Sequence, residues 1–304
     1  MAGSSVVKPD VLEATARRER RKLSVGDVVS KIVIYLILSF WAVIVIFPML
    51  WSIWSSFKTD KEIFFSPWAL PKVLMFENFA RAWVKARIGQ YLGNTLLIII
   101  PSLFLTLLLS AMASYVLARF EFKGRTFIQY LFLLGMIFPI FLALVPLYFT
   151  MQKLSLLDTY QGLIMVYVAF SLSFTTFFLT NFFKTLPREL GEAALIDGAD
   201  QFSIFFQIYL PLASPGLITM GIFNFLGQWN QYILPNTLMI TNTDTVTHYV
   251  LSQGLYYLQA QQFYQNDWSG LFAAVTIVMV PTLIVYLIFN DRIENGLTAG
   301  AIKG

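Results

Sequence analysis

Six long runs without a charged side chain dominate this sequence of 304 residues. The residues that bound them are Lys31 and Lys58, Arg87 and Arg119, Arg125 and Lys153, Asp158 and Lys184, Asp200 and Asp244, and Asp267 and Asp291. Each run is rich in Leu, Ile, Phe and Val, and each is long enough for the roughly 20 residues that an α-helix needs to cross ~30 Å of hydrocarbon. Because 57% of all residues are hydrophobic and only 12% are charged, the sequence predicts an all-α membrane protein.

Six membrane-spanning helices are expected, one in each run. The run after Asp200 is too long for one helix, because Pro211 and Pro215 interrupt its start and residues 236–267 turn polar. We therefore expect its span in the middle and a loop outside the membrane after it. The expected spans are 32–57, 93–117, 128–150, 160–183, 214–235 and 269–290, which together form a transmembrane domain over residues 32–290.

The flanking segments lack the features of a cleaved signal peptide. The polar region before the first apolar run is long, the run exceeds an ordinary signal core, and no small-residue cleavage site follows. We expect residues 1–31 to form a retained N-terminal arm and residues 291–304 to form a C-terminal tail. The basic cluster at residues 17–22 is expected to set the topology and to meet anionic membrane lipid.

The distribution of Lys and Arg predicts the orientation of the chain. With six spans, both termini lie on one side, and 14 of the 21 basic residues fall there against 7 on the other. Since basic residues accumulate in cytoplasmic loops, both termini are expected in the cytoplasm. The loop at 58–87 weakens this bias because it carries six basic residues, although it also carries acidic ones.

Most enzyme classes are excluded by missing residue types. The chain has no Cys and a single His, His248, and the dipeptide Gly-Lys never occurs. Thiolate chemistry, His-pair zinc sites and Walker A loops are therefore absent, and we expect no catalytic residue, no bound metal and no cofactor on this chain. A net charge of +4 on so apolar a chain gives no indication of nucleic-acid binding.

Residues 184–213 form the most informative loop. Glu189 and Glu192 lie where the first turn of a short helix favours anions, and Gly198 is suited to end that helix. A second short helix follows, in which Phe202, Phe205, Phe206 and Tyr209 would share one face before Pro211 stops it. The small and acidic residues of the first helix and the aromatic face of the second predict either a docking surface for a cytoplasmic partner or a hairpin that only connects two spans.

This loop resembles the EAA loop of the permease subunits of bacterial ABC importers. The matching residues, with the family's spacing, are Glu192, Ala193, Ala194, Gly198, Ile208, Leu210 and Pro211. Further stretches are similar to carbohydrate-uptake permeases, and most of all to the member of the permease pair that resembles the maltose-system G permease. They are 54–58, 94–96, 115–120, 124–125, 146–148, 156–159, 162–164, 229–230 and the tail 296–304.

The resemblance implies a binding-protein-dependent importer in the bacterial cytoplasmic membrane. Its implied partners are a second homologous permease subunit, two ATP-binding cassette ATPase subunits that hold the ATP and Mg, and an extracytoplasmic sugar-binding protein. The chain would form half of the pore for a sugar or an oligosaccharide. By resemblance, the coupling residues are Glu192, Ala193, Ala194, Asp197, Gly198, Ile208, Leu210 and Pro211.

Uncharged polar residues within the spans are candidates for the translocation path. In the fifth span Asn224, Gln228 and Gln231 are spaced to share one helix face, beside Trp229 and Asn230, and the fourth span adds Asn181. Polar groups within a membrane are costly unless they face protein or a water-filled cavity. They therefore either line a path for sugar or hydrogen-bond neighbouring helices as packing contacts.

Three alternatives stay open beside a sugar permease. The same type of importer could carry a non-sugar solute or a sugar-phosphate. An ion-coupled secondary transporter is disfavoured because such proteins use carboxylates within the membrane, whereas every Asp and Glu here lies outside the six expected spans. A structural anchor without transport would leave the loop at 184–213 unexplained.

Overall fold

The computed structural model describes residues 25–239 and 248–301, and within these ranges every regular element is a helix. Residues 1–24 of the predicted arm, 240–247 of the predicted polar loop and 302–304 of the tail lie outside the described residues. The chain divides into two compact units, Met1–Ser52 and Ile53–Gly304. Among the described residues four helices are long and apolar enough to span a membrane, or up to six if each of two bent pairs counts as one span.

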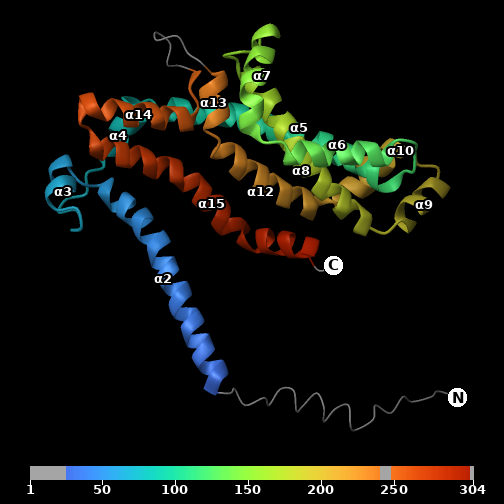
Figure 1. Ribbon diagram of the computed structural model, residues 1–304, viewed down its shortest axis with the longest axis horizontal. Helices are drawn as coiled ribbons and strands as arrows, with labels where there is room; N and C mark the ends of the chain where they lie inside the picture. Colours follow the sequence, from blue (N-terminus) through green and yellow to red (C-terminus); the bar gives the residue numbers. More distant parts are fainter. Residues whose placement is uncertain (1–24, 240–247, 302–304) are drawn as a thin grey trace. The chain divides into compact units, whose positions relative to one another are not determined.

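The first unit contains most of α2, which runs from Val25 to Ser55 (Figure 1). Its apolar side chains are exposed throughout, from Val28 to Phe47. Such a helix, apolar on all sides, is stable only when lipid or protein surrounds it, which agrees with the predicted first span.

The second unit holds the other helices in chain order (Figure 1). They are α3 (Asp60–Phe65), α4 (Glu77–Val84), α5 (Ile88–Arg119), α6 (Arg125–Ile137), α7 (Ile140–Lys153), α8 (Tyr160–Thr185), α9 (Glu189–Ile196), α10 (Gln201–Ser203), the π-helix η1 (Ile204–Tyr209), α11 (Leu210–Leu212), α12 (Ser214–Trp229), α13 (Ile233–Leu238), α14 (Leu251–Gln265) and α15 (Trp268–Ala301).

The helix α5 organises this unit. It packs along α8 and also contacts α12, α14 and α4, while α6 lies against α8 and α15 against α12 (Figure 1). Two hydrophobic cores form along α5, one around Tyr91 and Ile98 and the other around Ala111 and Tyr115. In Figure 1, α3 and α4 lie near one end of the second unit and α9 near the other, so α5 connects two separately packed ends.

Two predicted spans are not single helices. Residues 128–150 divide into α6 and α7, which meet at an angle of 100°. Pro139 is the cause, because the residue before a proline is driven out of the helical region, and Phe138 is extended. The helix expected over 214–235 ends at Trp229. A new helix, α13, then begins at Ile233, whose N–H donates a hydrogen bond to the Gln231 side chain.

Candidate functional site

The loop at 184–213 contains a surface helix followed by a sharp reversal. Helix α9 ends at Ile196, and Gly198 adopts a left-handed φ of +85°. The N–H groups of Gly198 and Ala199 then return to the carbonyls of Leu195 and Ala194. This is the glycine-dependent helix ending that the sequence predicts.

The first predicted coupling residues lie mostly on the outside of α9. Glu192, Ala193 and Asp197 are exposed, and Ala194 is half-buried. The apolar side chains of Leu195 and Ile196 are also exposed, Ile196 to 86%. The end of α9 therefore exposes acidic, small and apolar side chains together.

The second half of the loop differs from the predicted aromatic face. Phe205 and Tyr209 are buried, whereas Phe202 and Phe206 are exposed. The reason is that residues 204–209 form a π-helix, whose wider turn changes the angle between successive side chains, so that a spacing chosen for an α-helix no longer selects one face.

The last three predicted coupling residues lie at the end of this π-helix. Ile208 and Leu210 are half-buried and Pro211 is exposed. Pro211 does not stop the helix as predicted, because the helical path continues through α11, and the chain instead bends by 71° before α12. Pro211 is the second residue of α11, where the fixed φ of a proline suits helical geometry.

An arginine and two tyrosines hold the loop against the end of α5. The Arg119 guanidinium donates to the carbonyls of Phe183 and Leu186 at 2.8 and 2.9 Å, and its carbon lies 4.4 Å from the ring centre of Tyr209. It therefore caps the C-terminal end of α8, where the helix dipole favours a cation, while it packs on the second half of the loop.

Tyr209 and Tyr115 complete this anchor. The hydroxyl of Tyr209 donates to the carbonyl of Pro187 at 3.2 Å, and its ring packs on Tyr115 at 5.3 Å. Tyr115 also packs on Phe205 and donates to the Gln201 side chain at 3.2 Å. We call Tyr115, Arg119, Phe205 and Tyr209 the loop anchor. Tyr115 and Arg119 are not among the site residues that the sequence predicts. The signal that identifies them is an aromatic residue and a cation together at the end of an apolar run.

The predicted path residues divide between buried and exposed positions. Asn224 is buried and donates to Thr175 at 2.9 Å, and Gln228 is buried between Ser102 and Ser171. These hydrogen bonds join α12 to α5 and α8. This arrangement is the one expected if the polar residues serve as packing contacts between helices. Lining of a path by these residues stays a prediction.

The other predicted path residues have different surroundings. Trp229 is buried and donates to the carbonyl of Val278, whereas Asn230 is exposed and returns to Leu226 of its own helix. Gln231 is half-buried. Asn181 is exposed and lines a separate hollow on α8 with Gln129 and Lys184.

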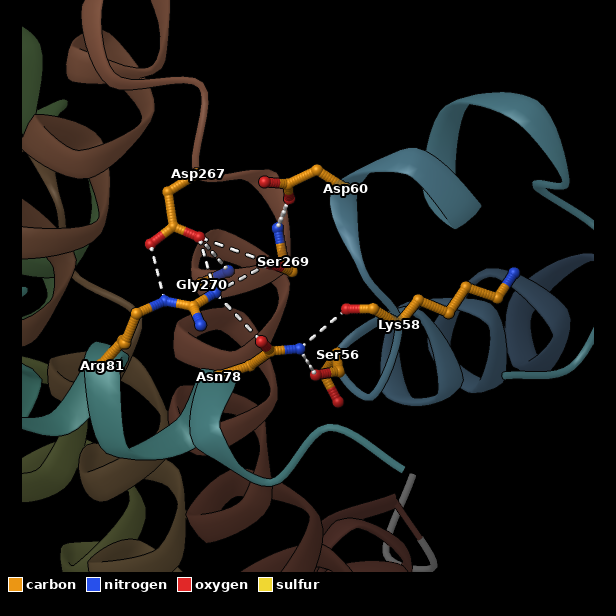
Figure 2. Close-up of polar contacts among 8 residues, drawn as sticks. All are labelled: Ser56, Lys58, Asp60, Asn78, Arg81, Asp267, Ser269 and Gly270. Atoms are coloured by element: carbon orange, nitrogen blue, oxygen red, sulfur yellow. Dashed lines mark hydrogen bonds and ion pairs between the residues drawn. The ribbon is translucent and has the colours of Figure 1, made fainter. Parts of the chain in front are cut away.

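A charged cluster joins α4 to the start of α15 (Figure 2), and α4 lies near the end of the second unit opposite to α9 (Figure 1). Arg81 of α4 forms an ion pair of 3.0 Å with Asp267, just before α15, and also donates to Ser269 and Asn78. Asp60 accepts a hydrogen bond of 2.7 Å from the N–H of Ser269. Burial alone would raise the pKa of Asp267, but hydrogen bonds from Arg81 and the Gly270 N–H lower it below its ordinary value.

Comparison with known proteins gives this geometry a context. Residues 106–299 match the family described as "Binding-protein-dependent transport system inner membrane component". The chain is 49% identical over 267 residues to the diacetylchitobiose uptake system permease protein NgcG of Streptomyces coelicolor, covering 88% of this chain and 87% of that protein. It is 33% identical over 270 residues to the arabinooligosaccharides transport system permease protein AraQ of Halalkalibacterium halodurans, covering 88% and 94%.

A solved structure agrees in fold. A chain of a bacterial ABC transporter that imports the polysaccharide alginate superposes with a TM-score of 0.76, at 20% identity and over 88% of this chain and 98% of that one. Because the family match spans well over half of the residues, and a relative at 49% identity is aligned over most of its length, this chain belongs to the binding-protein-dependent transport system inner membrane components, the permease subunits of ABC importers.

Proposed function

We propose that this permease forms half of a pore that imports a neutral oligosaccharide, with a disaccharide of N-acetylated sugars as the first substrate to test. The observation that carries the proposal is the 49% identity, over 88% of the chain, to a permease whose name states diacetylchitobiose uptake. The expected spans contain uncharged polar and aromatic side chains and no acid, which suits a neutral solute that binds through hydrogen bonds and aromatic faces.

The loop at 184–213 is the proposed contact with the ATPases. In this proposal it faces the cytoplasm, as do both termini, in a bacterial inner membrane. Glu192 and Asp197 offer exposed carboxylates to a basic group on the ATPase, and Ala193 lets its backbone approach closely. The loop anchor would transmit movement of α9 to α5 and α8, because Arg119 contacts the end of α8 and the π-helix together.

The remaining partners follow from the same proposal. A second permease would complete the pore, two ATPase subunits would hold ATP and Mg, and a binding protein would deliver the sugar from outside. A sugar-phosphate or a non-sugar solute is the alternative substrate class. The exposed Asn181 and Asn230 are better placed than the buried Asn224 to meet a solute, since Asn224 already donates to Thr175.

Uptake by the reconstituted complex tests the substrate. The permease pair, the ATPases and the binding protein are placed in proteoliposomes containing ATP, and entry of labelled diacetylchitobiose, an arabinooligosaccharide and a hexose phosphate is compared. We expect ATP-dependent and binding-protein-dependent entry of the first. Entry of the hexose phosphate alone would replace the proposal with the alternative, and ATP-independent entry would remove the importer assignment for this complex.

Two variants in the loop test coupling. Gly198→Val forces a β-branched side chain into a left-handed backbone, at a position where a Cβ meets no neighbour, so the whole effect comes from backbone strain of about 1–2 kcal/mol. Glu192→Ala removes one exposed carboxylate. We expect both variants to insert normally but to lose ATPase association and uptake.

Matched controls separate coupling from general damage. Gly124 has a similar left-handed φ of +95° and open space around it, but it lies outside the loop, so Gly124→Val carries the same strain elsewhere. Glu189→Ala removes an acid from the same helix, one turn earlier. Equal loss in Gly198→Val and Gly124→Val, or normal uptake in both loop variants, would contradict the coupling role.

A further inference from the structure

A row of large apolar side chains is exposed from the last turn of α3 to the residue before α4, outside the long apolar helices. The residues, which we call the 64–76 patch, are 55–86% exposed: Phe64, Phe65, Trp68, Leu70, Val73, Leu74 and Phe76. Scattered apolar residues on a surface need no explanation, but seven large apolar side chains exposed within 13 consecutive residues mark a contact with membrane or protein.

Two charged side chains near the patch, Lys58 and Glu62, pair with backbone groups of the chain. Lys58 is buried, and its ammonium donates to the carbonyls of Ser66 and Pro67 at 3.1 and 2.9 Å. The Glu62 carboxylate accepts from the N–H groups of Thr59 and Lys72 at 3.0 and 3.3 Å. Backbone groups in an irregular segment are costly next to lipid unless they are paired, and this arrangement pairs several of them.

The patch is held close to the start of α15. Asp60, the first residue of α3, accepts from the Ser269 N–H, and the Phe64 ring packs edge-on against Trp268 at 5.8 Å (Figure 2 shows Asp60 and Ser269). The Asn78 amide donates to the carbonyls of Ser56 and Lys58, both at 2.8 Å, which fixes α4 to the chain just after α2.

These contacts limit how far the patch can lie from the membrane. Helix α3 has six residues, so Phe65 is within about 9 Å of Asp60 along the helix. The polar layer on each side of the hydrocarbon is about 5–8 Å thick. If α15 begins where the chain enters the membrane, the patch lies within or beside that layer.

We propose that the 64–76 patch is a lipid anchor, which lies in the headgroup layer of the same membrane that α5 and α15 cross. Aromatic residues are favoured at this depth, and the exposed Lys61 and Lys72 can extend their ammonium groups toward water and lipid phosphate. The anchor would hold α4, and through Arg81 the start of α15, at a fixed depth while other helices move. This inference rests on the proposed membrane crossing of α5 and α15.

The lipid surface is favoured over a binding protein as the occupant. Of the charged side chains near the patch, Asp60, Glu62 and Arg81 are engaged within the chain. The exposed ones within the segment, Lys61 and Lys72 beside Glu77, are mostly basic, which suits anionic lipid. The patch is also tied to the ends of two apolar helices rather than raised above them.

Spin labels can test this depth directly, because the chain has no Cys. Single variants Phe65→Cys and Leu70→Cys are labelled with a nitroxide, and the whole importer is placed in nanodiscs of phosphatidylethanolamine and phosphatidylglycerol. Collision of the label with oxygen, which concentrates in lipid, is compared with collision with a water-soluble nickel complex. Phe40→Cys in the middle of α2 serves as the lipid control and Asn236→Cys, exposed on α13, as the water control.

We expect both patch labels to favour oxygen over nickel severalfold relative to Asn236→Cys, with no change when the binding protein is added. High nickel collision at both sites would overturn the anchor. Low collision with both reagents would place the patch against a partner subunit, and protection that appears only with the binding protein would assign it to that protein; either also overturns the proposal. ATPase stimulation by the binding protein, measured in the same nanodiscs, reports separately on the proposed function.

Discussion

The two ends of α5 use an arginine in opposite ways. Beside its start, Arg81 neutralises Asp267 within the chain, and the nearby 64–76 patch exposes large apolar side chains. At its end, Arg119 binds carbonyl oxygens and a tyrosine ring, so the acids of α9 are left exposed at the surface. In the two proposals above, a contact with lipid therefore lies near the start of α5 and a contact with another protein subunit lies near its end.

The difference also bears on how firmly each end is held. Arg119 makes two charge-assisted hydrogen bonds to main-chain carbonyls and a cation–π contact, each of which fixes part of the loop. The Arg81 and Asp267 side chains are 25% and 36% exposed, and partly exposed ion pairs contribute little, about 0–1 kcal/mol. We therefore expect the loop end to depend more on its arginine than the patch end does.

The largest effect is expected from Arg119→Ala. The substitution removes hydrogen bonds worth about 1.5–3 kcal/mol each and a cation–π contact worth about 0.5–2 kcal/mol, offset in part by water. A net loss of about 3 kcal/mol would raise hydrogen exchange in residues 184–213 by about a hundredfold, with residues 56–87 unchanged. Arg119→Lys should be intermediate, because an ammonium keeps the charge but lacks the planar guanidinium that packs on the Tyr209 ring. Equal exchange in wild type and Arg119→Ala would contradict the anchor.

Much of the fold follows from the charge-free runs, because a run of apolar residues has few ways to avoid water. These runs predict α2, α5 and α8 to within about seven residues at each end, and the start of α15 to within one. Helix α15 continues to Ala301, into the segment expected as a tail. The runs cannot show that Pro139 divides one span into two helices at 100°, since a proline inside a membrane helix is often tolerated by a mild kink.

The loop illustrates what periodicity can and cannot provide. The sequence predicts the turn at Gly198 because this turn depends on the backbone freedom of a single residue. The prediction that Phe202 and Phe205 share one face is wrong because it assumes an α-helix. The π-helix that forms instead is stabilised by the packing of Phe205 and Tyr209 on Tyr115. Arg119 meets Tyr209 across 90 residues of sequence, a pairing that no local pattern contains.

A smaller loss of stability is expected from Gly191→Ala, at the point where α9 approaches the loop anchor. A Cβ on Gly191 would lie 2.7 Å from the Tyr209 hydroxyl, so Gly191→Ala must displace that ring and its hydrogen bond to Pro187. Overpacking of this kind costs about 1–3 kcal/mol, measured as the loss of thermal stability of the purified complex. Because Tyr209→Phe removes the closest atom, the double variant should lose less than the sum of the two single variants. Strict additivity would indicate that the two residues do not meet.

The smallest loss of stability is expected from Asp267→Asn, near the 64–76 patch, and the pH dependence of this loss is a sensitive test. Since the folded pKa of Asp267 is lowered, its contribution is fully present above the unfolded pKa of about 3.9 and is lost only as pH falls through the lower folded value. Asp267→Asn should therefore lower stability by at most about 1 kcal/mol, with the same offset from wild type across about pH 5–8, and the two melting curves should converge only below about pH 4. A difference in stability between Asp267→Asn and wild type that changed near neutral pH would mean that another titrating group controls the stability near the 64–76 patch. A difference as large as that of Arg119→Ala would contradict the expectation that the loop end depends more on its arginine than the patch end does.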